Sequence, residues 1–154
     1  MKDNFYHLGF GTTWIGKHWP RNKNYLYPRD SEVHNYLDYI FENIEGSKLL
    51  IDTAREYGNA ETRLGKYFES NPKYFSRAVI CSKFGGSLKR QLLKEKNNGF
   101  RITVENMVDD FCYSLDKLGR IDIYYSHLIN DVNVKQATTF LRKGKYLAIL
   151  DYWK

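Results

Sequence analysis

The hydrophobic residues of the chain follow two different spacings, and these predict helices that alternate with strands. Between residues 31 and 46, apolar side chains recur every three or four positions, which is the repeat of one helix face. Ser31 can cap this helix, and Gly46 can end it. The predicted apolar face consists of Val33, Tyr36, Leu37, Ile40, Phe41 and Ile44.

Three other segments carry a helical repeat. Residues 60–70 form one, with Pro72 beyond its end, and residues 133–143 form a weaker one. The clearest repeat covers residues 104–118, with Thr103 as its cap. Its stripe consists of Val104, Met107, Val108, Phe111, Leu115 and Leu118. The chain therefore alternates long amphipathic helices with the shorter apolar segments between them.

Those shorter segments are nearly continuously apolar, as expected for parallel strands that are buried on both faces. The predicted strands are 5–11, 48–54, 77–84, 121–128 and 146–150. Strict alternation of strands and helices indicates an α/β protein with a parallel sheet and right-handed crossovers. We find no linker or internal repeat, so residues 1–154 are predicted to form a single domain.

Two architectures agree with this order: an open doubly wound sheet, or part of a (β/α)8 barrel. A G-x-G-x-x-G phosphate-binding sequence after the first strand would favour the open sheet. Here Gly9 and Gly11 are followed by Thr13 and Trp14, so that sequence is absent.

Composition is that of a globular protein, with 42% hydrophobic and 16% aromatic residues among 154. No apolar stretch approaches the ~18 residues of a membrane span, and the N-terminus lacks a signal peptide's apolar region. Cys81 and Cys112 lie in apolar periodic segments, which predicts reduced core cysteines in a cytoplasmic protein. No His/Cys cluster has the spacing of a metal site.

The net charge of +6 is unevenly distributed. Segments 15–30 and 84–102 together contain nine basic and two acidic residues. These two segments are either solvated loops or a surface that attracts anions. Nucleic acid is an unlikely partner, because no basic motif interleaved with aromatic residues accompanies this charge.

Polar residues stand at or just behind the ends of three predicted strands: Asp52, Tyr57, Lys83 and His127. In parallel α/β folds the chemistry collects at the carboxyl ends of the strands, so these side chains can meet in one pocket. A buried Lys83 needs a carboxylate nearby, and Asp52, one strand away, is the natural partner. An ammonium beside Tyr57 would stabilise the phenolate and make this phenol a workable proton donor.

With these residues in view, the sequence resembles the N-terminal part of an aldo-keto reductase. The resemblance implies an eight-stranded barrel and NADP(H)-dependent reduction of a small-molecule carbonyl. It covers nearly the whole chain, in the family's order. It rests on "LGFGTTW" (8–14), "IDTAREYGNAETRLG" (51–65), "VICSKFGG" (79–86), "SLDKLGRIDIYYSH" (114–127) and, more faintly, "LRKGKYLAIL" (141–150).

The resemblance also implies a role for each candidate residue. Tyr57 would give its proton to the carbonyl oxygen, Lys83 paired with Asp52 would tune Tyr57, and His127 would orient the carbonyl. The substrate would contact Trp14 and His127. The implied cofactor-binding residues are Gly11, Thr12, Thr13 and Asp52.

A complete barrel of this kind needs about 250 residues. We therefore expect an incomplete barrel of about five parallel strands and four helices, whose inner face, with Leu50, Val79 and Ile123, lacks the facing strands. A second copy or another polypeptide would complete it, or the sequence is a fragment or the product of a truncated gene. NADP(H) binding is expected to be weak or lost in the isolated chain. The alternative function is a non-catalytic remnant or interaction module that retains the four residues by descent.

Overall fold

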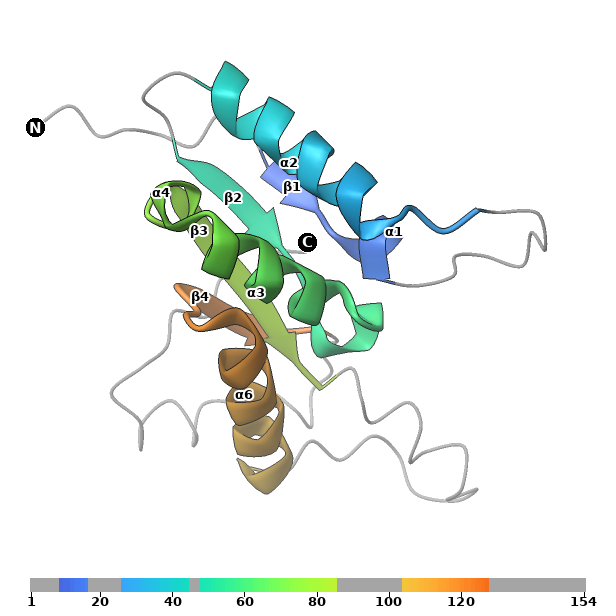
Figure 1. The fold of residues 1–154 in the computed structure, drawn as a ribbon. Helices are drawn as coiled ribbons and strands as arrows, with labels where there is room; N and C mark the ends of the chain where they lie inside the picture. The colour runs from blue at the N-terminus through green and yellow to red at the C-terminus, as the bar shows by residue number, and fades with distance from the viewer. Residues whose placement is uncertain (1–8, 17–25, 45–47, 86–103, 128–154) are drawn as a thin grey trace, which may run out of the picture.

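The computed structural model describes residues 9–16, 26–44, 48–85 and 104–127. These residues contain a parallel sheet of four strands in the order β1-β2-β3-β4 (Figure 1). The strands are β1 (Gly9–Gly11), β2 (Leu49–Asp52), β3 (Ala78–Phe84) and β4 (Ile123–Ser126). Sequential neighbours along the chain are therefore neighbours in the sheet.

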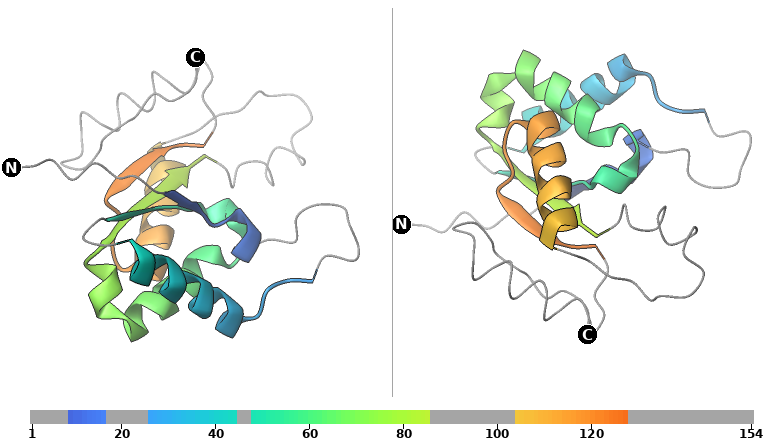
Figure 2. Two further views of the ribbon diagram at one scale, coloured as in Figure 1. Left: turned by 90° about the horizontal axis from the view of Figure 1, so that it is seen from above. Right: turned by 90° about the horizontal axis from the view of Figure 1, so that it is seen from below.

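The helices of this part of the chain lie on one face of the sheet, as Figures 1 and 2 show from different sides. An open doubly wound sheet would carry helices on both faces. Sequential order with helices on a single face is the arrangement of a barrel wall. The long helices are α2 (Asp30–Asn43), α3 (Ala60–Ser70) and α6 (Val104–Leu118), and the short ones are α1 (Thr13–Gly16), η1 (Arg55–Tyr57) and α4 (Pro72–Phe75).

The hydrophobic core fills the space between the sheet and the helices. Alternate residues of a strand point to opposite faces, so Ile51 and Ile80 face the helices, whereas Asp52 and Cys81 face the other side. Phe41 of α2 stacks on Tyr74 of α4 with ring centroids 4.8 Å apart. Other fully buried members of this core are Leu37, Leu49, Ala60, Leu64 and Tyr67.

Helix α2 begins differently from the prediction. Its first residue is Asp30, and Arg29 occupies the cap position, so Ser31 lies inside the first turn. The carboxylate of Glu32 accepts a 2.7 Å hydrogen bond from the Arg29 N–H, which satisfies one backbone donor before the helix. Tyr36 was predicted to face the core but is 57% exposed, because it lies at the margin of the apolar stripe, close to the ring of Phe10.

Helix α6 buries a more polar face than its stripe predicts. Val108 and Leu115 are 43% and 39% exposed, while Asp110 and Ser114 are buried. These two polar side chains find hydrogen-bond partners beneath the helix, which makes their burial tolerable. Pro72 is not simply beyond α3, since it begins α4, a position that suits its fixed φ angle.

Some predicted elements lie outside the described residues. They are the helix 133–143, the strand 146–150, the cap Thr103, the helix end Gly46, and most of the basic segments 15–30 and 84–102. No helix in the described part is long and apolar enough to cross a membrane. That same part contains no group of three His, Cys, Asp or Glu side chains able to hold a metal ion.

The two cysteines have different surroundings, and the prediction that both lie in the core is wrong for Cys112. Cys112 is exposed on α6, whereas Cys81 of β3 is only 4% exposed. Burial, with a smaller contribution from the Asp52 carboxylate, raises the pKa of the Cys81 thiol to about 12. At neutral pH Cys81 therefore holds its proton, and the thiolate is the reactive form.

We expect a thiol reagent at pH 7.5 to label Cys112 quickly and Cys81 only after unfolding. Mass spectrometry of the native chain should show one added group, and the chain in urea should show two. A Cys112→Ser variant provides the control, because it should remain unlabelled until urea is added. Rapid labelling of this variant in the native state would contradict the burial of Cys81.

Candidate active site at the strand ends

Lys83 forms the centre of the candidate site. Its side chain is 8% exposed, and its Nζ lies 2.8 Å from Asp52 Oδ2. The ammonium also donates to the Thr53 carbonyl at 2.9 Å and to the Tyr57 hydroxyl at 3.2 Å. These three acceptors match the three donors of a lysine ammonium. The buried charge is therefore both paired and hydrogen-bonded, which is the condition for its burial.

The turn after β2 delivers Tyr57 to this ammonium. The Tyr57 N–H donates to the Ala54 carbonyl at 2.8 Å to form η1, and Gly58 ends the turn with a φ of 68°, which favours glycine. Helix α1 packs directly on the turn, since a Cβ on Gly16 would come within 1.8 Å of the Tyr57 carbonyl oxygen. The missing side chain at position 16 thus permits the close contact that supports η1.

His127 directly follows β4, and its ring contacts the ring of Tyr57. Its N–H donates to the Phe84 carbonyl at 2.9 Å, which continues the β3–β4 pairing by one residue. Its ring meets that of Tyr57 edge to face, with centroids 5.7 Å apart. The ring nitrogen Nδ1 lies 3.7 Å from Glu56 Oε2. The structure thus brings together all four residues predicted from the strand ends.

Tyr125 also belongs to this cluster, although sequence reasoning assigned it no role. It pairs with Lys83 in the β3–β4 register, and its hydroxyl donates to Asp52 Oδ1. Burial and the Asp52 carboxylate raise the pKa of Tyr125, so this phenol holds its proton more tightly than a free one. The sequence did contain a signal for Tyr125. It lies two residues before His127, and residues two apart in a strand point to the same face of the sheet.

The predicted cofactor and substrate residues follow β1. Gly11 pairs with Asp52, and a Cβ added at Gly11 would meet no atom within 4 Å. Thr13 is partly exposed, and Trp14 is 50% exposed. Thr12 is fully buried, and its hydroxyl and its N–H each donate to the Asp52 carbonyl at 3.0 Å. Thr12 thus holds the end of β1 against β2, whereas the other three positions border accessible space.

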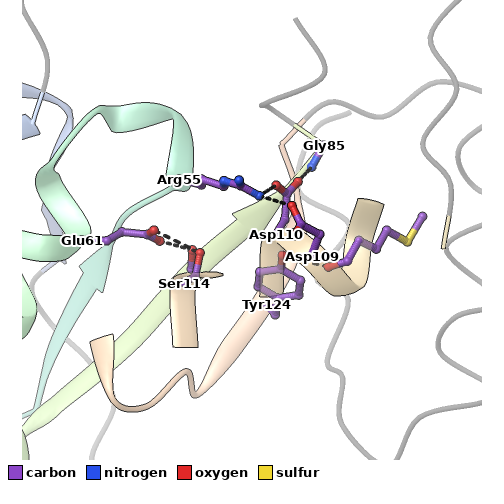
Figure 3. Close-up of polar contacts among 9 residues, drawn as sticks. Arg55, Glu61, Gly85, Asp109, Asp110, Ser114 and Tyr124 are labelled. Carbon is purple, nitrogen blue, oxygen red and sulfur yellow. Dashed lines mark hydrogen bonds and ion pairs between the residues drawn. The ribbon is translucent and has the colours of Figure 1, made fainter. Parts of the chain in front are cut away.

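A second polar network joins the η1 turn to helix α6 (Figure 3). Arg55 Nη1 lies 2.6 Å from Asp109 Oδ2 and 2.8 Å from Asp110 Oδ1. The other carboxylate oxygen of Asp110 accepts the N–H of Gly85 at 3.0 Å. The network joins η1, α6 and the residue after β3, so it links the turn that carries Tyr57 to the strand that carries Lys83. Its members come from segments distant in sequence, and no local pattern predicts them.

Glu61 forms the third polar group, on the helix side of the sheet. It is 2% exposed and accepts hydrogen bonds from Ser82 at 2.6 Å and Ser114 at 3.1 Å, the latter drawn in Figure 3. Burial raises the pKa of the Glu61 carboxyl. Because Ser82 and Lys83 point to opposite faces of β3, Glu61 stays apart from the candidate site and connects α3, β3 and α6.

The geometry at the strand ends suits proton transfer to an oxygen atom. A phenol is held by a cation, an imidazole faces the phenol, and a carboxylate neutralises the cation. A sequence model of the aldo/keto reductase family matches residues 7–153. A comparison with curated protein sequences found no match.

Solved structures that are similar to this chain are also aldo-keto reductases. A crystal structure assigned as an aldo-keto reductase from Pseudomonas aeruginosa is 25% identical, with a TM-score of 0.61 over 88% of this chain and 49% of that chain. A thermostable aldo-keto reductase crystallised with the inhibitor epalrestat is 21% identical, with a TM-score of 0.63 over 94% of this chain and 49% of that chain. At 21% identity the second likeness shows the fold alone.

The chain spans about half the length of these solved structures. Its sequential parallel sheet with helices on one face is accordingly part of the barrel that they contain. Because the family match extends over nearly all of the sequence, the chain belongs to the aldo/keto reductase family.

Proposed function

We propose that this chain carries the proton-transfer site of an NADP(H)-dependent oxidoreductase that reduces a carbonyl group to an alcohol. One observation carries the proposal: the Lys83 ammonium contacts both the Asp52 carboxylate and the Tyr57 hydroxyl. A cation beside a phenol stabilises the phenolate that remains after proton donation, and therefore favours the donation itself.

Each side chain of the site has a separate role in this proposal. Tyr57 donates its proton to the carbonyl oxygen as the carbonyl carbon is reduced. Lys83 stabilises the resulting phenolate, and Asp52 neutralises the Lys83 ammonium and holds it in place. His127, which faces the Tyr57 ring, donates a hydrogen bond that orients the carbonyl oxygen. General acid catalysis by a positioned group of this kind contributes about 10²–10⁴-fold to the rate.

When bound, NADPH supplies the hydride that the carbonyl carbon accepts. The described residues fit one end of such a cofactor, because Gly11 leaves open space at the end of β1 and Thr13 and Trp14 stand beside it. We assign Gly11 and Thr13, with Asp52 next to them, to the cofactor side. Trp14 is assigned to the substrate side with His127.

We expect the chain by itself to bind NADPH weakly and to turn over slowly. It spans about half the length of the solved relatives. Fixing two reactants in a productive geometry contributes on the order of 7 kcal/mol or more, and half a barrel offers few contacts for that purpose. A second copy or another polypeptide would complete the wall. The free thiols of Cys81 and Cys112 support a cytoplasmic location, which is part of the proposal.

The test combines three measurements on the purified chain: its mass in solution, NADPH binding followed by fluorescence, and NADPH oxidation with a simple aldehyde. The proposal predicts slow, aldehyde-dependent oxidation that disappears in the Lys83→Met variant. Activity confined to a dimer would identify a second copy as the missing wall. Binding without oxidation in every assembly state would contradict the proposal and favour a non-catalytic interaction module.

A further inference from the structure

We propose that Glu56 is a positioning residue that keeps His127 protonated, so that the imidazolium is the form that binds the carbonyl oxygen. The inference rests on the proposed function for its catalytic consequence. Its structural part, the coupling between Glu56 and His127, stands on the geometry of η1 and β4.

The two side chains form a partly buried pair. Glu56 Oε2 lies 3.7 Å from His127 Nδ1, and the side chains are 17% and 22% exposed. Glu56 directly precedes Tyr57 in η1, so the turn that presents the phenol also presents this carboxylate. Opposite charges within ~4–6 Å favour each other's ionised forms, more strongly as solvent is excluded.

The position of the carboxylate decides which ring nitrogen can serve the substrate. Nδ1 faces Glu56, so in the proposed function Nε2 is the ring nitrogen that binds the carbonyl oxygen. A neutral imidazole has a single N–H, and a carboxylate beside Nδ1 holds that proton there. Nε2 would then direct a lone pair at the carbonyl oxygen and repel it. Only the imidazolium donates from both nitrogens, so Glu56 ties the orienting hydrogen bond to the charge of His127.

Among the described residues, other titratable groups border the site on β2, β3, η1 and β4. Lys83 on β3 carries a positive charge that opposes a second cation, but Asp52 on β2 lies 2.8 Å from it and compensates. Tyr57 on η1 and Tyr125 on β4 contribute phenols, and burial with the Asp52 carboxylate keeps Tyr125 protonated. Glu56 then supplies the opposite charge at Nδ1 of the imidazole.

The direct test is the titration of His127 in the Glu56→Gln variant, followed by NMR of the imidazole nitrogens. We expect the midpoint of His127 to fall by roughly one pH unit in this variant. We also expect the neutral ring to change from the Nδ1–H tautomer towards the Nε2–H tautomer. The chain has four histidines, and His127→Gln identifies the resonance of interest.

Two controls separate this effect from a general disturbance. His34 of α2, which packs on the ring of Tyr67, should titrate identically in the original chain and in Glu56→Gln. Glu42→Gln removes a carboxylate that accepts a hydrogen bond from Tyr74, and it should leave His127 unchanged. If Glu56→Gln does not fold, Glu56→Asp keeps the charge on a shorter side chain and should retain part of the raised midpoint.

This titration needs neither cofactor nor turnover, so its result is independent of the proposed function. An unchanged His127 midpoint in folded Glu56→Gln would overturn the inference even in an active enzyme. A shifted midpoint in a chain without reductase activity would keep the coupling and remove the proposed function. In an active preparation, Glu56→Gln should move the alkaline limb of the reduction rate to lower pH by the same interval.

Discussion

Replacement of Tyr57 by Phe should lower aldehyde-dependent NADPH oxidation by about 10²–10⁴-fold, the contribution expected of a positioned general acid. The substitution removes the hydroxyl that accepts from Lys83 Nζ at 3.2 Å. It keeps the ring, which lies 4.7 Å from Nζ and edge to face with His127. The loss should therefore appear in kcat, with little change in KM or in NADPH affinity. Steady-state kinetics and fluorescence titration measure the three quantities.

Tyr125→Phe is the matched control for this experiment. It also removes a phenolic hydroxyl beside Lys83 and Asp52, from a ring 5.1 Å from Nζ. Because Tyr125 holds its proton tightly, it is not the expected donor, and its loss should cost less than about tenfold. If Tyr125→Phe abolished activity while Tyr57→Phe retained it, the proton donor would have to be reassigned.

Gly65→Ala should destabilise the fold by about 3 kcal/mol. Gly65 lies in α3, where alanine would ordinarily be favoured over glycine by about 1 kcal/mol. Here a Cβ would come within 1.8 Å of the Lys117 carbonyl oxygen of α6. Backbone atoms cannot move aside as a flexible side chain can, so α3 and α6 would have to separate. Urea unfolding monitored by circular dichroism gives the change in the free energy of unfolding.

Gly11→Ala provides the comparison, since a Cβ there would meet no atom within 4 Å. Its effect on stability should remain within about 0.5 kcal/mol, as for an unhindered surface substitution. Equal stability of Gly65→Ala and the unmodified chain would show that α3 and α6 do not approach as closely as described. An increase in stability would lead to the same conclusion, because the intrinsic helix preference of alanine would then prevail.

Local patterns predicted the parts of the site that a single strand or turn controls. Lys83 lies at the end of an apolar strand and His127 directly follows another, so both side chains were expected at the carboxyl edge of the sheet. Parallel pairing then brings such strand ends together, so the contact between Lys83 and Asp52 was predictable before any coordinates. The absence of a dinucleotide-binding glycine sequence also pointed away from the open sheet.

Features that depend on several segments were missed or misjudged. Cys112 and Val108 fit the periodicity of α6, yet both are exposed. Helix α6 instead turns Asp110 and Ser114 inward. The partners of Asp110 are Arg55 on η1 and the N–H of Gly85, just after β3. Those of Ser114 are Ser82 on β3 and Glu61 on α3. The pairing of Glu56 with His127 likewise joins residues separated by about half of the chain.

The sequence by itself determined the order of helices and strands, the parallel sheet and the identity of the residues at the strand ends. These properties follow from the spacing of side chains and the direction of the chain, and each short stretch of sequence contributes to them separately. Tertiary structure alone decided that Tyr125 reaches Asp52, that Glu56 faces Nδ1 of His127, and which polar residues α6 buries. Those outcomes depend on distances of a few ångströms between segments far apart in sequence, and the free energy of burying each polar group is fixed only once its partner is in place.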